Sequence, residues 1–197
     1  MRRSAPNRYP DTMTHPAPEA DVQATIAQLW IHPVKSCAAV SVQEAELAPT
    51  GLAWDRAWMV VDAEGEFVTQ RELPRMALIQ PSFKLGQLVL RAPGMLALHL
   101  SLEAAEYPRR VRVWDDAVDA WDMGDLAAQW FSDFLGADAP ADLKRLRLVR
   151  FDPEVKRLCS AKWTGGRASV TQFADGFGVL VASTASLDEL NARLAKA

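Results

Sequence analysis

Three cationic side chains and a hydroxyl in the N-terminal part of the chain have the chemistry of an anion site. Lys35 and Ser36 lie in the turn His-Pro-Val-Lys-Ser-Cys. Arg56 follows a loop that contains Gly51, and Arg71 follows the segment Phe-Val-Thr-Gln. An arginine can donate two parallel hydrogen bonds to a phosphate, while a lysine supplies a compact charge. Solvated surface charges beside neighbouring carboxylates are the alternative, and the spacing alone leaves both open.

A second pair of hydroxyls, Ser183 and Thr184, stands before a segment with helical periodicity at 187–194. The free backbone N–H groups at a helix N-terminus attract anions. Serine and threonine are also common helix N-caps, which is the more frequent use of these residues. The pattern therefore predicts a helix start and leaves both roles of the hydroxyls open.

The remaining reactive residue types show no spacing that indicates a metal site or a catalytic group. Cys37 and Cys159 each lack a second cysteine or a histidine at ligand spacing, so we expect buried, unreactive thiols. A group of aspartates lacks the loop spacing of a calcium site, and turns and helix caps explain it better: Asp115, Asp116, Asp119, Asp122 and Asp125. We predict no metal ligand and no catalytic side chain.

Short strands separated by turns should position these residues. Apolar runs and period-two alternation recur at intervals of about 8 to 12 residues, which is typical of a β-barrel or sandwich. The expected strands cover 22–31, 40–47, 58–61, 67–69, 76–85, 87–92, 96–102, 109–114 and 116–121. A turn at Glu64-Gly65 should make the third and fourth of these strands a hairpin.

The pattern changes after residue 121. Apolar residues at 126, 130, 131 and 134 follow helical spacing, with Asp125 as the expected N-cap and Gly136 as the stop. We then expect a strand at 146–151, a mobile polar loop at 156–168, a buried strand at 179–182 and a last helix at 187–194. The predicted fold class is mainly β with α (α+β).

The composition suits one apolar core in a reducing compartment. Of the 197 residues 49% are hydrophobic, and the net charge of −3 argues against general nucleic-acid binding. No apolar run approaches the roughly 18 residues that a membrane span needs, and no secretory signal follows Arg2 and Arg3. With two distant cysteines, a cytoplasmic protein is the expectation. Residues 1–22 are rich in proline and are expected to form a disordered tail.

Taken in order, a series of motifs resembles the N-terminal β-barrel domain of MOSC proteins. The motifs are His32–Cys37, Gly51-Leu52, Asp55–Val61, Thr69–Glu72, Val113–Asp116, Gly124–Trp130 and Phe134–Gly136. Phe173–Asp175 and Ser183–Asn191 resemble the opening of the MOSC domain proper. The resemblance runs from about residue 24 to the end of the chain. It implies a β-barrel domain over 23–150 and an incomplete MOSC β-barrel over 151–197.

Members of this family include the mitochondrial amidoxime-reducing component. They bind molybdenum cofactor (molybdopterin) and reduce N-hydroxylated compounds with electrons from a partner redox protein. By this resemblance the cofactor contacts are Lys35, Ser36, Arg56, Arg71, Ser183 and Thr184. The first three match positions that hold the pterin and its phosphate, and the last two match a second set of contacts. A small-molecule substrate and an electron-donor protein are the implied partners, and pyridoxal phosphate is not expected.

The resemblance also shows what is missing. The metal ligand of the family is a cysteine downstream of the last helix, in a segment that these 197 residues do not include. An Arg-Pro-Asn segment with further contacts is also missing, and Cys37 matches a family position outside the metal's coordination shell. We therefore expect a truncated N-terminal part that binds the cofactor incompletely. A non-catalytic module that binds a phosphate-bearing small molecule, or an inactive fragment, are the alternatives.

Overall fold

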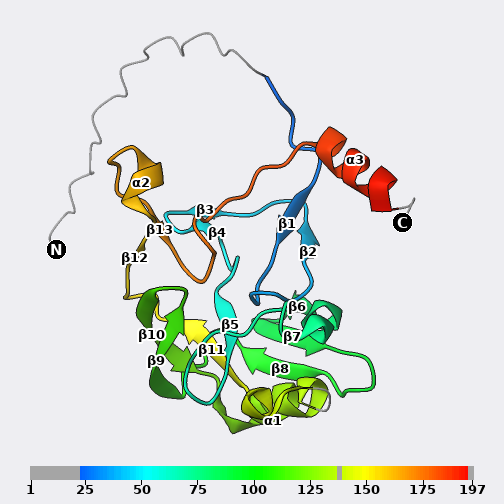
Figure 1. Ribbon diagram of the computed structural model, residues 1–197, viewed down its shortest axis with the longest axis vertical. Helices are drawn as coiled ribbons and strands as arrows, with labels where there is room; N and C mark the ends of the chain where they lie inside the picture. Colours follow the sequence, from blue (N-terminus) through cyan, green and yellow to red (C-terminus); the bar gives the residue numbers. More distant parts are fainter. Residues whose placement is uncertain (1–22, 137–138, 195–197) are drawn as a thin grey trace, which may run out of the picture.

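The computed structural model describes residues 23–136 and 139–194, which form mostly short strands (Figure 1). The tail predicted for residues 1–22 lies outside the described residues. The strands are β1 (Leu29–Ile31), β2 (Val40–Val42), β3 (Leu47–Ala48), β4 (Gly51–Leu52), β5 (Trp58–Val61), β6 (Gln80–Lys84), β7 (Gln87–Arg91), β8 (Leu98–Ser101), β9 (Tyr107–Val113), β10 (Asp116–Asp122), β11 (Arg147–Phe151), β12 (Arg157–Leu158) and β13 (Val170–Thr171). The α-helices are α1 (Gly124–Leu135), α2 (Ala161–Thr164) and α3 (Thr184–Leu194), and short 3-10 helices cover Pro74–Leu78 and Ala141–Leu143. The predicted mainly β fold with α-helices is confirmed.

The largest sheet has the strand order β5-β11-β10-β9, with every neighbouring pair antiparallel. Strand β5 stands at its edge, but the free side of β5 is covered by two bridges. Val34 pairs with Trp58 in parallel orientation, and Phe67 pairs with Val61 in antiparallel orientation. The second bridge confirms the predicted turn at Glu64-Gly65, although the returning arm forms a single bridge and no full strand.

Strand β5 contributes side chains to both hydrophobic cores, which explains why its sequence is continuously apolar. All four of its residues are buried. Because successive side chains point to opposite faces, Trp58 and Val60 pack into one cluster with helix α1. Met59 and Val61 pack into the other, with residues of β9, β10 and β11. A strand buried on both faces reads as an unbroken apolar run and shows no alternation.

A three-stranded antiparallel sheet, β6-β7-β8, packs against the first core. The prediction of one strand over 76–85 was wrong at its start, because a 3-10 helix at Pro74–Leu78 precedes β6. Pro74 occupies the first turn of this helix, where proline needs no hydrogen-bond donor. Met76 and Ile79 are three residues apart and both are fully buried, which is the spacing of one 3-10 turn.

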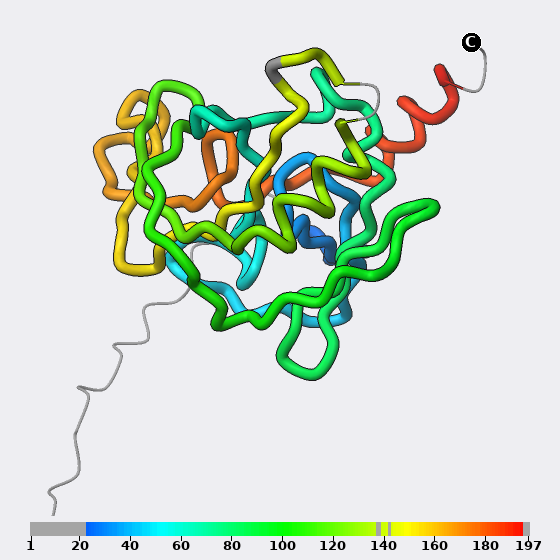
Figure 2. Tube along the Cα trace, turned by 90° about the horizontal axis from the view of Figure 1, so that it is seen from below, coloured from blue at the N-terminus to red at the C-terminus, as the bar shows by residue number. Residues whose placement is uncertain are grey.

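Helix α1 lies across the underside of the strands, as Figure 2 shows from below, and it contacts β11. Its apolar face, including Trp130, Phe131 and Phe134, is buried in the first core. The helix starts one residue before the predicted N-cap, so Asp125 lies in the first turn and does not cap it. Asp122 performs that function, since its Oδ1 accepts the backbone N–H of the first helical residue at 2.9 Å.

The C-terminal part of the chain differs from its prediction in two places. The polar loop predicted at 156–168 contains β12 and the short helix α2, and β12 pairs with β13. The buried strand predicted at 179–182 is not formed, because no strand among the described residues pairs with it, and Leu180 and Val181 are 85% and 86% exposed. Helix α3 follows and projects away from the body (Figure 1). This helix begins at Thr184, three residues before the predicted start at Leu187. No helix in the described residues is long and apolar enough to cross a membrane.

The first predicted strands are shorter than expected. Of the predicted strand at 22–31 only Leu29–Ile31 pairs, with Val40–Val42. The predicted strand at 40–47 divides into β2 and the start of the small β3–β4 hairpin. Alternation continues through both segments, but only the paired residues have a partner strand within hydrogen-bonding distance.

Candidate anion-binding site

The polar turn that contains Lys35 is joined by backbone hydrogen bonds to the start of β5. The N–H of Lys35 donates to the Trp58 carbonyl at 2.8 Å, and the N–H of Trp58 donates to the Pro33 carbonyl at 3.0 Å. The N–H of Arg56 donates to the His32 carbonyl at 2.7 Å. These bonds bring Lys35 and Arg56 to neighbouring positions, although 21 residues separate them in the sequence.

Two of the predicted site residues have an unusual backbone conformation. Ser36 has φ of 67° and Arg56 has φ of 51°, which is the left-handed region that side-chain-bearing residues seldom adopt. Asp55 stabilises the second of these turns, because its carboxylate accepts the His32 N–H at 2.6 Å and pairs with the Arg56 guanidinium. Strained backbone held by surrounding contacts is frequent at functional sites.

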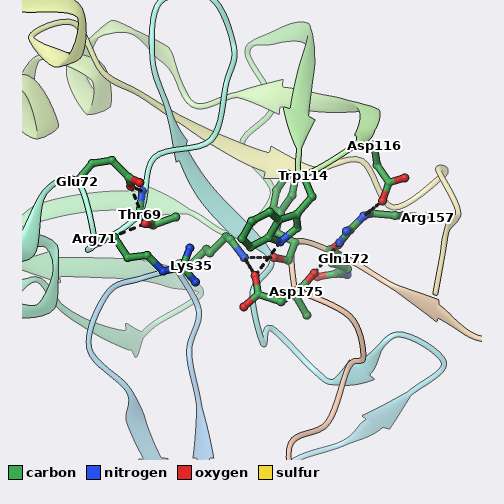
Figure 3. A network of polar contacts seen from close by, with 11 residues as sticks. Lys35, Thr69, Arg71, Glu72, Trp114, Asp116, Arg157, Gln172 and Asp175 are labelled. Atoms are coloured by element: carbon green, nitrogen blue, oxygen red, sulfur yellow. Dashed lines mark hydrogen bonds and ion pairs between the residues drawn. The ribbon is translucent and has the colours of Figure 1, made fainter. Parts of the chain in front are cut away.

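The segment 172–175 forms a third wall of the site (Figure 3). The N–H of Phe173 donates to the Arg56 carbonyl at 3.2 Å, which fixes this segment beside the two turns. The Lys35 ammonium donates to the Phe173 carbonyl at 3.0 Å and forms an ion pair with the Asp175 carboxylate. Lys35 is only 6% exposed, whereas the Asp175 side chain is 66% exposed.

Aromatic rings connect this ion pair to the Arg71 side chain. The Trp114 indole N–H donates to Asp175 at 3.0 Å, and the Arg71 guanidinium lies 5.5 Å from the centre of the Trp114 ring. Phe67 also packs against Trp114, with ring centres 4.9 Å apart, and the Lys35 ammonium lies 5.6 Å from the centre of the Phe67 ring. Cations over aromatic faces are held by the ring quadrupole.

These groups surround a pocket of about 630 Å³. The lining residues are His32, Lys35, Ser36, Cys37, Arg56, Thr69, Gln70, Arg71, Asp175, Gly176, Phe177, Val179 and Leu180. Four of the six predicted contacts are therefore brought together. Ser183 and Thr184 do not line this pocket; both are exposed, and the Ser183 hydroxyl accepts the Ser186 N–H at 3.1 Å as the N-cap of α3.

The charges in the pocket perturb one another. Burial lowers the pKa of Lys35 below its ordinary value, although the hydrogen bond and charge of Asp175 oppose this shift. Partial burial by itself would raise the pKa of Asp175. The hydrogen bond and charge from Lys35 outweigh this effect and hold the pKa of Asp175 below its ordinary value. The pocket thus holds a poorly hydrated cation whose nearest counter-charge is mostly in water.

The side chains are suited to binding an anion and offer no obvious metal ligands. Burial raises the pKa of the Cys37 thiol, so the thiolate form that binds metals or attacks substrates is disfavoured. Within the described residues, no group of three or more histidine, cysteine or acidic side chains could hold a metal ion. Cys37 and Cys159 are both free and buried, as predicted.

Sequence reasoning missed two residues of this site, Asp175 and Trp114. Both fell in segments named only for their resemblance to the family, Phe173–Asp175 and Val113–Asp116. Asp175 is 140 residues from Lys35, so no local spacing relates them. The one available signal was the single carboxylate between Phe173 and Gly176, in a segment otherwise without charge.

Comparison with known proteins identifies the family. The family model of the MOSC N-terminal beta barrel domain matches residues 23–138, and the chain belongs to this family. It is 37% identical over 180 residues to mitochondrial amidoxime reducing component 2 of Bos taurus, a match that covers 87% of this chain and 52% of that protein. It is 36% identical over 178 residues to mitochondrial amidoxime-reducing component 1 of Mus musculus, over 86% of this chain and 51% of that protein.

The chain spans about half the length of the curated relatives it matches. Among solved structures, a Bordetella bronchiseptica protein studied in solution is 27% identical, with a TM-score of 0.43. That match covers 57% of this chain and 92% of the other.

Proposed function

We propose that the pocket holds the phosphate-bearing end of molybdenum cofactor, in an oxidoreductase that reduces N-hydroxylated compounds. The observation that carries this proposal is the convergence of Lys35, Ser36, Arg56 and Arg71 on one pocket. The names of the relatives, amidoxime-reducing components, support the substrate class. The activity belongs to the whole protein, of which this chain corresponds to about half.

The residues present fit one end of the cofactor. Its phosphate requires cations and hydrogen-bond donors, and the pocket supplies a buried ammonium, two guanidinium groups and a hydroxyl. Its metal requires a thiolate, and Cys37 is unsuited because its buried thiol stays protonated. When bound, molybdenum cofactor supplies two-electron redox chemistry to the substrate nitrogen–oxygen bond.

The side chains of this chain have distinct roles in holding the phosphate. Lys35 offers a charge that water screens little, since only 6% of the residue is exposed. Arg56 can fork two phosphate oxygens while Asp55 fixes its guanidinium from the opposite side. Arg71 is exposed, lines the pocket and lies 5.5 Å from the Trp114 ring centre, so it offers a second guanidinium whose position the ring restrains. Asp175 neutralises the ammonium until an anion arrives.

The remaining expectations are part of the same proposal. Ser183 and Thr184 would contribute a second set of contacts, and the domain boundary would fall near residue 150. The substrate is a small molecule and the electron donor a protein, rather than nucleic acid or a membrane. We propose the cytoplasm as the compartment, supported by two free cysteines. The named relatives are mitochondrial. Fractionation of the source cells would show which of the two compartments contains this protein.

The test compares binding of molybdopterin, released from a donor protein, to the wild-type chain and to Arg56→Gln. Glutamine can still donate to Asp55, so the buried carboxylate keeps a partner. We expect affinity to fall by about tenfold or more, since a charge-assisted hydrogen bond contributes roughly 1.5–3 kcal/mol. Arg112→Gln is the control, because Arg112 pairs with Glu66 on the exposed surface. Equal affinity in wild type and Arg56→Gln would remove the phosphate site from the proposal.

A recognition module without turnover is the second candidate. It is favoured by the pocket's cations, a buried ammonium and two guanidinium groups, which suit any phosphate monoester. Such a module would bind inorganic phosphate or a phosphate monoester as well as it binds molybdopterin. Preference for molybdopterin over a simple phosphate monoester would support the cofactor site, and equal affinity would support the module.

A further inference from the structure

Arg157 is a buried arginine that does not line the pocket. It binds segment 172–175, the wall of the pocket that Lys35 also contacts. It lies on β12 and is 6% exposed. Its Nε donates to the Asp116 carboxylate at 2.7 Å, and its Nη1 donates to the carbonyls of Gln172 at 2.8 Å and Ala174 at 2.6 Å. The guanidinium therefore joins three parts of the chain that are distant in sequence.

The carbonyls of segment 172–175 alternate between two partners (Figure 3). Those of Gln172 and Ala174 accept from Arg157, whereas the intervening carbonyl of Phe173 accepts from Lys35 at 3.0 Å. Residues 172–175 form a bend, in which successive carbonyls point to different partners. Arg157 and Lys35 thus hold the same short segment from its two sides.

The β9–β10 hairpin is connected to this segment at two points. Asp116, the carboxylate partner of Arg157, begins β10, and Trp114 begins the two-residue turn before it. Trp114 donates to Asp175 at 3.0 Å, directly after the segment that Arg157 holds. The β9–β10 hairpin therefore fixes Asp175 through its own tryptophan and through Arg157.

We propose that Arg157 is a positioning residue for the anion site: by holding the carbonyls of Gln172 and Ala174, it presents the Phe173 carbonyl and Asp175 to the Lys35 ammonium. The proposal deepens the proposed function, because it rests on Lys35 as an anion-binding group. Arg157 contacts neither the pocket nor its ligand, so its effect passes through the segment. A lysine at this position could not replace it, since one ammonium cannot reproduce the planar fork that serves three acceptors.

A direct effect of charge is the alternative explanation. The charged groups that face Lys35 are Asp175, Arg157 and Arg56. The positive charge of Arg157 by itself lowers the pKa of Lys35, so a pure charge effect would leave Lys35 unchanged in a variant that keeps this charge. Displacing segment 172–175 would change the hydrogen bond and charge of Asp175 and the burial of the ammonium, even when the charge at position 157 is kept. Arg157→Lys therefore separates the two explanations, because it keeps the charge and loses the planar fork.

The experiment measures the titration of the Lys35 side chain by NMR between about pH 7 and 11, together with binding of inorganic phosphate by calorimetry. The variants are Arg157→Gln and Arg157→Lys, and the control is Arg110→Gln. Arg110 belongs to the same hairpin and pairs with Asp119 at 2.7 Å, but its side chain is 62% exposed. Folding of each variant is checked by circular dichroism.

Positioning predicts that both Arg157 variants bind phosphate at least about fivefold more weakly and that Arg157→Lys moves the titration midpoint of Lys35, while Arg110→Gln resembles wild type. A direct charge effect predicts that Arg157→Lys resembles wild type, so an unchanged Lys35 midpoint or an unchanged phosphate affinity in Arg157→Lys would overturn the proposal. If neither Arg157 variant folds, Asp116→Asn loosens the same guanidinium from a half-exposed position, leaves the charge of Arg157 in place and must also move the Lys35 midpoint. If the wild type binds no phosphate, the proposed function fails, but the Lys35 titration still decides the role of Arg157.

Discussion

Replacing Lys35 by methionine removes the buried ammonium and keeps an unbranched side chain of similar length. The phosphate would lose one charge-assisted hydrogen bond in a place that water screens poorly, because Lys35 is 6% exposed. Such a bond contributes about 1.5–3 kcal/mol, which corresponds to roughly a 10- to 150-fold loss of affinity. We expect phosphate binding by Lys35→Met to weaken within this range.

Opposing contributions should limit the change in stability. The variant leaves the Phe173 carbonyl without its 3.0 Å partner, at a cost of about 1–3 kcal/mol. The ion pair with Asp175 contributes less than about 1 kcal/mol, because that carboxylate is mostly exposed and its charge is screened. Against these losses, an ammonium no longer has to be dehydrated, which saves several kcal/mol. The net change in the free energy of unfolding should stay within about 2 kcal/mol.

Two measurements separate the effects: phosphate titration by calorimetry and urea unfolding followed by circular dichroism. Lys35→Arg is the matched variant, because it keeps the charge and should retain part of the affinity. A Lys35→Met variant that binds phosphate within twofold of wild type would refute the reasoning about the buried charge. A loss of stability far above the expected range would show that the ammonium is required for folding and not only for binding.

Three further predictions concern other residues. The pKa of Asp175 is held below its ordinary value, so its contribution to stability is present above about pH 4 and is lost as the pH falls through the lowered value. The difference in unfolding free energy between wild type and Asp175→Asn, less than about 1 kcal/mol, should therefore be constant near neutrality and shrink below pH 4 in urea titrations. Phe173 is fully buried, and Phe173→Ala should destabilise the chain by about 3–5 kcal/mol in thermal or urea unfolding. Burial raises the pKa of Cys37, so its thiol should react with a disulfide reagent only at the rate of unfolding, and fast reaction of the native chain would contradict this.

The grouping of Lys35, Ser36 and Arg56 could be anticipated from sequence because local structure determines it. A polar turn ends β1, another precedes β5, and the bridge from Val34 to Trp58 joins them. Strands close in sequence usually lie close in space, so cations at their ends tend to meet. Strand β5 could also be predicted from the sequence, since a short apolar run between turns indicates a strand with both faces covered.

The rest depended on long-range contacts that leave no periodic signal. The pairing of Lys35 with Asp175 joins residues 140 positions apart, and a single carboxylate in an uncharged segment does not by itself identify its partner. Arg157 lay in the predicted polar loop, because two of its partners are backbone carbonyls, which carry no sequence information, and the third is a carboxylate 41 positions away. The apolar run at 179–182 resembled a strand, but a strand requires a partner that its own sequence does not specify.

Trp114 gives the anion site a built-in optical reporter. Its indole N–H donates to Asp175 and its ring, 41% exposed, lies beneath the Arg71 guanidinium, so both polar neighbours of the fluorophore belong to the pocket. An anion that draws Lys35 away from Asp175, or Arg71 away from the ring, changes the local field and therefore the emission maximum. The difference spectrum between wild type and Trp114→Phe would isolate this one indole from the other tryptophans and allow occupancy to be followed in real time.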